Sequence, residues 1–231
     1  MSLSGGEKPA YQLYTYFRSS CSARVLIAAK LKNIQLARTY IDMGKEEHKT
    51  ASFKSLNPSG TLPVLVVRDA QGETAITQSV AILEYLEEIG GAALLPPAGN
   101  PKDRAKVREL VGIITTDLFP PTNGRIAQMV RGIRGEVGDQ VKFVQTIMAS
   151  GLAGYEAMLQ GCSGRYSFGD AVTMADVCLA PAVDMAVGYK VDMAPYPRVL
   201  AVYEDLMKLQ AFKDSNWKAQ EDTPEQYRQA V

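Results

Sequence analysis

The hydrophobic pattern of this 231-residue chain changes once, and that change divides the chain into two parts. Up to residue 89, runs with strand character alternate with runs of helical spacing, in the order β-α-β-α-β-β-α. Residues 90–101 interrupt both periods with three glycines and three prolines, which is typical of a linker. We therefore predict an α/β domain over 11–89, a linker over 90–101 and an all-helical domain over 102–231.

The first domain is predicted to hold a small mixed sheet with helices on its faces. The four expected strands cover residues 13–17, 37–41, 63–67 and 74–76, and the expected helices cover 21–31, 45–54 and a run that begins at Ser79. Residues 68–73 are predicted as a turn. In the second domain, residues 120–140 are rich in glycine and arginine and are expected to form a loop or a broken helix.

Thr173 and Asp176 have the spacing of a capping box, with a hydroxyl at the N-cap and an acid three residues later. We assign Asp176 to folding and not to catalysis, because an acid in the first turn of a helix stabilises that helix.

Composition excludes several classes of function. The formal charge is zero, which gives no basis for binding nucleic acid or an anionic membrane surface. No apolar run approaches the roughly 20 residues that span a bilayer, and residues 1–9 lack the apolar core of a secretory signal. Three scattered cysteines and a single histidine, His48, predict neither a disulfide framework nor a metal site. A reducing, cytoplasmic setting fits best.

A hydroxyl-rich turn, Ser19-Ser20-Cys21-Ser22, stands between the first strand and the first helix. The N–H groups at a helix start lack helical partners and lie at the positive end of the helix dipole, so they can hold an anion. The anion of interest is a thiolate, to which a serine hydroxyl can donate. Plain capping by the serines is the alternative. Tyr16, at the strand end, is the alternative hydroxyl donor, although a sheet aromatic is the simpler interpretation.

Gln78 and Ser79 begin a second helix and form a second candidate anion site. Two such starts in one small domain suit a ligand with both a thiolate and a carboxylate, and glutathione is such a ligand. His48 and Lys49 are candidates for its second carboxylate. The peptide bond between Leu62 and Pro63 is either a trans strand edge or a cis bond that exposes backbone groups to a peptide ligand.

These motifs resemble those of the zeta class of glutathione transferases, the class that includes maleylacetoacetate isomerase. The resemblance runs from about residue 11 to residue 224. The segments that carry it are Tyr16-Phe17-Arg18-Ser19-Ser20-Cys21-Ser22, Leu56-Asn57-Pro58, Leu62-Pro63, Gln78-Ser79 with residues 82–88, Gly169-Asp170, residues 173–181, and Val191-Asp192 with Pro195-Tyr196-Pro197. The Ser-Ser-Cys turn is specific to the class, whereas the segment around Asp176 is common to all glutathione transferases.

The resemblance implies a thioredoxin-like N-terminal domain, an all-α C-terminal domain, a homodimer and glutathione as the cofactor. It also implies isomerisation of a maleyl keto acid in the breakdown of tyrosine and phenylalanine. Ser19 is expected to donate to the thiolate, with Ser20 and Cys21 ranked behind it. The full set of residues implied to hold glutathione is Ser19, Ser20, Cys21, Ser22, Arg24, His48, Leu62, Gln78, Ser79 and Asn123.

Four positions depart from the family's pattern on the substrate side. They are Ala23 in place of tryptophan, Phe119 in place of glutamine or histidine, Ala182 in place of glutamine, and Gly188 in place of an arginine thought to bind a substrate carboxylate. The remaining candidates to bind that carboxylate are Arg18, Arg24, Arg125, Arg131 and Arg134. Three alternatives stay open: a transferase acting on α-halo acids, a monothiol oxidoreductase using Cys21, and a non-catalytic binding protein.

Overall fold

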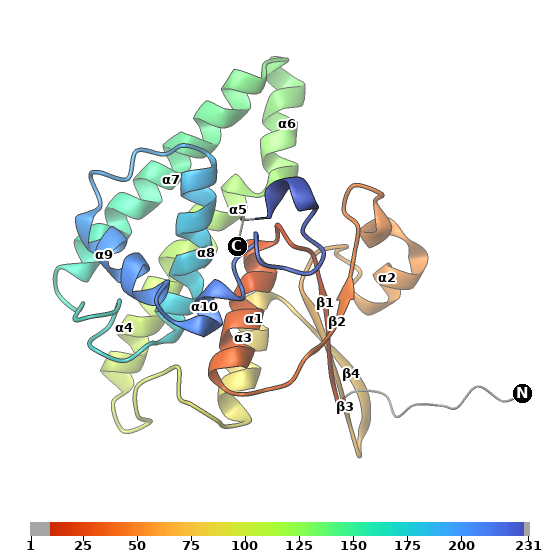
Figure 1. Ribbon diagram of the computed structural model, residues 1–231, viewed down its shortest axis with the longest axis horizontal. Coiled ribbons are helices and arrows are strands. Elements are labelled where there is room, and N and C mark those ends of the chain that lie inside the picture. The colour runs from red at the N-terminus through yellow and green to blue at the C-terminus, as the bar shows by residue number, and fades with distance from the viewer. Residues whose placement is uncertain (1–9, 229–231) are drawn as a thin grey trace, which may run out of the picture. The chain divides into compact units, whose positions relative to one another are not determined.

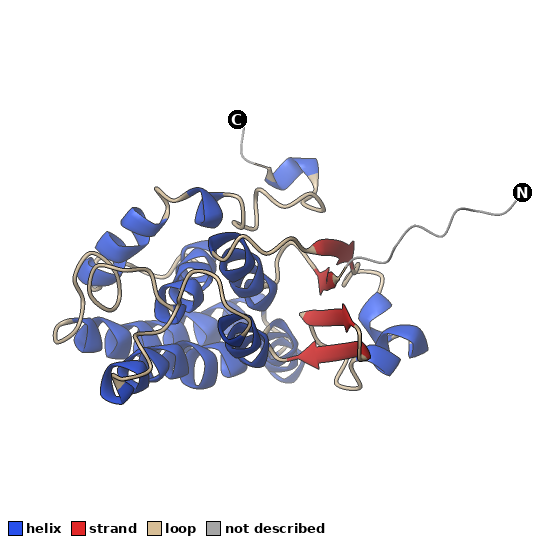
Figure 2. Cartoon of the chain, turned by 90° about the horizontal axis from the view of Figure 1, so that it is seen from below, coloured by secondary structure: helices blue, strands red, loops and turns tan. Residues whose placement is uncertain are grey.

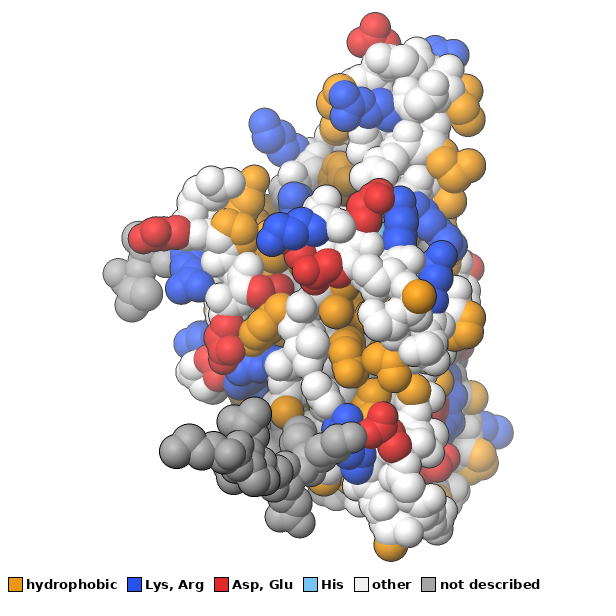
Figure 3. Space-filling view, turned by 90° about the vertical axis from the view of Figure 1, so that its right-hand side faces the viewer, with side chains coloured by type: hydrophobic (Ala, Val, Ile, Leu, Met, Phe, Trp, Pro, Cys, Tyr) orange, Lys and Arg blue, Asp and Glu red, His pale blue; other side chains and the backbone are white. Residues whose placement is uncertain are grey.

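The structure, a computed structural model, describes residues 10–228. It has two compact units, one made of the chain up to Gly91 with the segment from Trp217 onward, and the other of Ala92–Asn216. No helix within the described residues is both long and apolar enough to cross a membrane. Lys and Arg side chains are interspersed with Asp and Glu on the face drawn in Figure 3, in keeping with a net charge of zero.

The first unit is built on a four-stranded sheet with strand order β2-β1-β3-β4. Strands β1 (Tyr11–Thr15) and β2 (Ala37–Tyr40) are parallel, whereas β3 (Val64–Asp69) pairs antiparallel with both β1 and β4 (Gly72–Thr77). The order of elements confirms the predicted β-α-β-α-β-β-α pattern. The predicted turn over 68–73 is too long, because β3 and β4 continue their pairing to Asp69 and Gly72.

Helices cover both faces of this sheet (Figures 1 and 2). Helices α1 (Ser20–Leu31) and α3 (Ser79–Glu88) lie on one face, and α2 (Ala51–Leu56), preceded by the 3-10 turn η1 (Glu47–Lys49), lies on the other. On the α2 side, Phe53 packs with Val64 and Val66, while Leu13 and Leu65 are fully buried. Alternation along the strands therefore supplies both faces with apolar side chains.

The described part of the C-terminal segment packs with the first unit, and this differs from the predicted division, which placed all of 102–231 in the helical domain. The Phe17 N–H donates to Asp222 Oδ2 at 2.8 Å, and Glu221 accepts hydrogen bonds of 2.6 Å from Arg38 and from Tyr40. The segment's single 3-10 turn, η3 (Glu225–Tyr227), has no apolar period, so spacing could not place it.

The second unit is all-helical, as predicted. Its helices are α4 (Pro101–Gly112), the π-helical turn η2 (Ile113–Leu118), α5 (Phe119–Thr122), α6 (Gly124–Arg134), α7 (Val137–Leu159), α8 (Met174–Gly188), α9 (Pro197–Leu206) and α10 (Gln210–Lys213). The segment 120–140 is the broken helix that its composition suggested. Helix α8 forms the centre of the unit, because its residues from Met174 to Val183 are all buried.

Two local features organise this unit around the start of α8. The capping box is present, with reciprocal bonds between Thr173 and Asp176. The Met174 N–H also donates to the Leu94 carbonyl at 2.7 Å, and the side chains of Leu94 and Leu95 are almost fully buried. Residues 92–100 are thus packed against the helical unit and do not form a free linker.

Candidate functional site

Ser19 caps the first helix, and its hydroxyl proton makes no hydrogen bond to a described residue. It is the N-cap of α1, and its N–H donates to the Tyr16 carbonyl at 2.9 Å, which closes a turn after β1. Its Oγ accepts from the Ser22 N–H at 3.1 Å and from the Ser22 hydroxyl at 3.0 Å. Within the described residues the Ser19 O–H proton has no acceptor. The capping and thiolate-donor interpretations are therefore compatible, because capping uses the oxygen and donation would use the proton.

Arg24 joins the two predicted anion sites. Its side chain is 2 % exposed, although it carries a permanent charge. Its Nη1 donates to Ser79 Oγ at 3.1 Å and lies 3.7 Å from Cys21 Sγ. A buried cation is costly unless it meets polar partners. Here the guanidinium places positive charge between the start of α1 and the start of α3, where anionic groups of a ligand were expected.

Backbone strain marks the start of the second helix. Gln78, the N-cap of α3, has φ +70° and ψ 117°, a region that non-glycine residues rarely adopt. Such a conformation costs about 1–3 kcal/mol and persists where surrounding structure enforces it. Its carbonyl still accepts the Ile82 N–H at 3.0 Å, and Ser79 is buried as the first helical residue. Strain at a helix start next to a buried hydroxyl supports a binding role.

The loop that leads to β3 is held by Asn57, a residue to which sequence reasoning gave no role of its own. Its Nδ2 donates to the Thr61 carbonyl at 2.7 Å, and its Oδ1 accepts from the Ser59 N–H at 3.1 Å and the Ser59 hydroxyl at 2.8 Å. The Leu62–Pro63 bond that follows is cis. Of the two geometries that the sequence left open, the structure has the cis form.

His48 lies in η1 and is partly buried. Its Nδ1 is buried and makes no hydrogen bond to a described residue. Lys49, the other basic candidate, is paired with Glu46. The His48 imidazole can therefore still form a hydrogen bond with a ligand group, whereas the ammonium of Lys49 is already paired with the Glu46 carboxylate.

The first unit contains nine of the ten residues predicted to hold glutathione. Direct contacts join Ser19 to Ser22, and Arg24 to both Cys21 and Ser79. The tenth, Asn123, is in the second unit, where its Oδ1 caps α6 by accepting the Arg125 N–H at 3.1 Å. A ligand role for Asn123 stays a prediction. Tyr16 lies just beyond β1, and burial, the largest cause, raises the pKa of its phenol.

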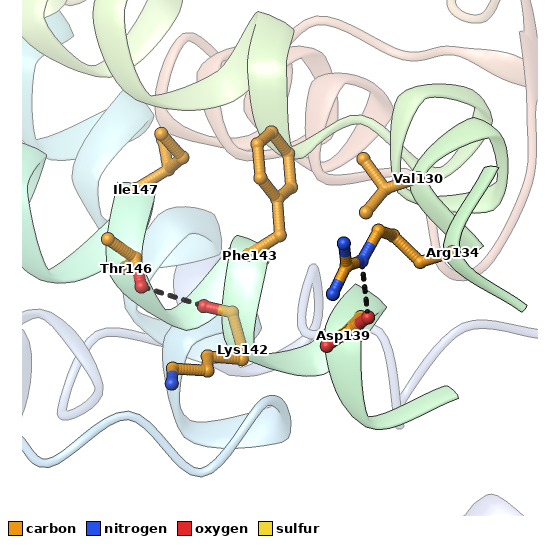
Figure 4. A pocket seen from close by; sticks show the side chains of 7 residues that line it. All are labelled: Val130, Arg134, Asp139, Lys142, Phe143, Thr146 and Ile147. Carbon is orange, nitrogen blue, oxygen red and sulfur yellow. Dashed lines mark hydrogen bonds and ion pairs between the residues drawn. The ribbon is translucent and has the colours of Figure 1, made fainter. Parts of the chain in front are cut away.

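Two cavities of the second unit lie near helices of the candidate substrate side. One, of about 310 Å³, lies between α6 and α7 and is lined by Val130, Phe143 and Ile147 with the ion pair of Arg134 and Asp139 (Figure 4). In that pair, Arg134 Nε donates to Asp139 Oδ2 at 2.8 Å, so Arg134 already has a carboxylate partner. The other cavity, of about 240 Å³, lies beside η2. Sequence spacing gave no sign of this π-helical turn, a feature often found at functional sites.

The family models that match the chain are the glutathione S-transferase N-terminal domain, over residues 18–89, and the C-terminal domain, over residues 69–205. The chain is 44% identical to maleylacetoacetate isomerase maiA of Aspergillus fumigatus, over 95% of this chain and 96% of that protein.

Solved structures agree with these matches. One is the holo structure of a maleylpyruvate isomerase, a bacterial glutathione S-transferase in the zeta class, with TM-score 0.86 and 37% identity over 92% of this chain and all of that one. Another is a maleylacetoacetate isomerase from Anaeromyxobacter dehalogenans with glutathione bound in its active site, with TM-score 0.85 and 33% identity over 93% of this chain and 98% of that one.

Proposed function

Because this chain belongs to the glutathione S-transferase family, in the zeta class with the maleylacetoacetate isomerases, we propose that it is a glutathione-dependent cis–trans isomerase of a maleyl keto acid. The observation that carries the proposal is the buried Arg24 guanidinium between two helix starts, each with a serine hydroxyl. This donor set fits a tripeptide with a thiolate and a carboxylate. We further propose that this activity belongs to aromatic amino-acid breakdown, as the resemblance to the zeta class implies.

Glutathione, when bound, supplies a thiolate that adds reversibly to the cis double bond of the substrate. The chain's task is to keep that sulfur ionised. A free thiol with a pKa near 8.5 is only a few per cent ionised at pH 7. Lowering its pKa by about two units takes about 2.7 kcal/mol. A hydroxyl bonded to a charged acceptor supplies about 1.5–3 kcal/mol and a helix start about 0.3–1 kcal/mol, so Ser19 and α1 suffice without an internal base.

The other residues hold the rest of the tripeptide. We assign one carboxylate to Ser79, Gln78 and the first N–H groups of α3, with the Arg24 charge behind them, and the second carboxylate to His48. The backbone of Leu62, which precedes the cis bond, is left to pair with the peptide. The first unit is thus the glutathione-binding domain, and the second supplies the substrate site. We further propose a cytoplasmic homodimer, and the free thiols of all three cysteines agree with a reducing compartment.

The test of the isomerase is to incubate the purified full chain and glutathione with maleylacetone and, separately, with a panel of α-halo acids. We expect maleylacetone to be converted to its trans isomer without net consumption of glutathione. Halide release from the α-halo acids with no isomerisation would replace this proposal with the transferase alternative. A calorimetric titration that shows no glutathione binding would instead support a non-catalytic protein.

Gly188 allows a sharper form of that assay. It ends α8, and a Cβ built on it would meet no atom within 4 Å beyond its chain neighbours and the backbone of its own helix, so the position accommodates a side chain. Gly188→Arg is expected to lower KM for maleylacetone about tenfold, because a new charged pair with the substrate carboxylate is worth about 1.5–3 kcal/mol. Gly188→Gln, of similar length but uncharged, is the control. Equal KM values for both variants would place the carboxylate elsewhere.

Arg24 provides a second prediction. Arg24→Met keeps the length of the buried side chain and removes its charge and its bond to Ser79. We expect glutathione binding measured by calorimetry to weaken at least tenfold. The free energy of unfolding should stay within about 1 kcal/mol, because losing a buried charge also removes its desolvation cost. Arg68→Met, at a position paired with Glu73, is the control and should leave binding unchanged. Unaltered binding in Arg24→Met would remove the guanidinium from the site.

A further inference from the structure

The turn that carries Ser19 is anchored by residues about 200 positions away in the sequence. Phe17 and Arg18 are the central residues of the turn that the Ser19 N–H closes on the Tyr16 carbonyl at 2.9 Å. The Phe17 N–H points out of that turn and donates to Asp222 Oδ2 at 2.8 Å. The turn is therefore closed by a bond within its own backbone and tied by the Phe17 N–H to a carboxylate outside it.

Aromatic packing holds the same turn from its other side. The buried Phe17 ring stacks on Tyr227 at 6.3 Å between centroids and lies 6.5 Å from the Trp217 ring. The Arg18 guanidinium lies 6.0 Å from the centroid of the Trp217 ring. Both central side chains of the turn thus contact the segment 217–228, which we call the C-terminal strap.

The strap is fixed independently of the turn. Glu221 bonds Arg38 and Tyr40 at the end of β2, the Thr223 hydroxyl donates to the Trp217 carbonyl at 2.6 Å, and Arg228 Nε donates to the Thr223 carbonyl at 2.9 Å. Asp222 is therefore a rigid acceptor. Its other oxygen, Oδ1, is buried and accepts no hydrogen bond from a described residue. The hydrogen bond from the Phe17 N–H is therefore the contact through which this carboxylate acts on the turn.

We propose that Asp222 is a positioning residue for the glutathione thiolate: through the Phe17 N–H it fixes the turn that sets the direction of the Ser19 hydroxyl. This inference rests on the proposed function and adds to it a residue that does not touch the ligand. A hydroxyl that is misdirected loses most of its hydrogen bond, because these interactions weaken steeply as the angle closes. The pKa of the bound thiol thereby depends on the strap, which is distant from Ser19 in the sequence.

The test compares three variants of the full-length protein. Asp222→Ala removes the acceptor, Asp222→Asn keeps a carbonyl oxygen for the Phe17 N–H, and Glu225→Gln removes the charge of an exposed strap residue that the argument does not use. The readouts are the pKa of the bound glutathione thiol, followed by the ultraviolet absorbance of the thiolate, and the affinity for S-methylglutathione, which has no ionisable sulfur.

We expect Asp222→Ala to raise the pKa of the bound thiol by about one unit and to lower kcat/KM about tenfold. Affinity for S-methylglutathione should stay within about twofold of the wild type, because the contacts to the peptide are retained. Asp222→Asn should restore most of the wild-type pKa. Asp222→Leu, which also lacks an acceptor but fills more of the site, replaces the alanine variant if that variant does not fold, and the same rise is expected. Glu225→Gln should leave the thiol pKa unchanged.

An unchanged thiol pKa in Asp222→Ala, or an equal rise in Glu225→Gln, would overturn the role of Asp222 while leaving the proposed function intact. Failure of the wild-type protein to bind glutathione would overturn both, so the two failures are distinguishable.

Discussion

Ser19→Ala is expected to raise the pKa of the bound glutathione thiol by one to two units and to lower turnover at neutral pH at least tenfold. The hydroxyl proton of Ser19 has no acceptor among the described residues, while its oxygen accepts from Ser22 twice. Removing the hydroxyl takes away about 1.5–3 kcal/mol of stabilisation from a thiolate. The measurement is a pH titration of the thiolate absorbance of the glutathione complex, with turnover of maleylacetone measured in parallel.

Ser19 is also the N-cap of α1, so the alanine variant loses helix stability as well as a donor. Two further variants separate these effects. Ser19→Gly keeps the cap within a few tenths of a kcal/mol and lacks the hydroxyl, so it should match the alanine variant in thiol pKa but not in stability. Ser19→Thr keeps the hydroxyl and should retain activity. Wild-type turnover in the glycine variant would exclude Ser19 and leave Ser20, Cys21 and Tyr16 as the candidate donors.

Cys21 provides the comparison for the oxidoreductase alternative. Its sulfur lies 3.7 Å from Arg24 Nη1, the same group that bonds Ser79. The alternative requires a mixed disulfide at Cys21 after treatment with oxidised glutathione, detectable by mass spectrometry. Its absence, together with retained isomerase activity in Cys21→Ala, would end that alternative.

The second large effect concerns folding. Asp176→Ala is expected to lower the free energy of unfolding by roughly 3–5 kcal/mol. The Asp176 carboxylate is fully buried, and it accepts from the Thr173 N–H at 2.7 Å, the Thr173 hydroxyl at 3.0 Å and the Ser167 N–H at 2.8 Å. Burial, the largest cause, raises the pKa of this carboxyl, and these bonds counteract that rise. Alanine leaves the donors without partners in the core.

Urea denaturation followed by circular dichroism measures this loss. Asp170→Ala is the matched control, because Asp170 also accepts a backbone bond, from the Arg165 N–H at 2.8 Å, but is exposed. The control should change stability by less than about 1 kcal/mol. If Asp176→Ala changed stability no more than the control, the carboxylate would need a role in ligand binding instead of folding.

Periodicity predicted the order of elements in the first unit because each buried strand or helix presents apolar residues at its own spacing. It failed where that spacing is absent. Strand β4 is largely exposed and carries polar residues, so its first half looked like a turn. Helix η2 continues the apolar pattern of α4 through Ile114, so the change from α-helical to π-helical winding is not visible in the spacing of apolar residues. The strap 217–228 packs against Phe17 through two aromatic rings, those of Trp217 and Tyr227, which have no period.

The binding residues were predicted on a different basis, the resemblance of short motifs, and the structure adds physical content to those motifs. Ser19 was ranked first as a donor, and in the structure its oxygen accepts from Ser22 while its hydroxyl proton has no acceptor among the described residues. Arg24 was among the residues implied to hold glutathione. Its hydrogen bond to Ser79 joins residues that are 55 positions apart, and no local sequence pattern reveals such a contact. The roles of Asn57 and Asp222 were missed for the same reason, since both act on backbone groups of a loop or a distant turn.

The first unit is discontinuous in the sequence, and this has a consequence for how the protein is made. A ribosome releases residues 92–216 before it releases the strap, so the helical unit can complete its core while the first unit still lacks Asp222 and Trp217. Expression of residues 1–91 alone would yield the sheet without its contacts to the strap. The turn before Ser19 acquires its anchor only after residues 92–216 have been made, so the candidate thiol site matures later than the chain order of Ser19 alone would suggest.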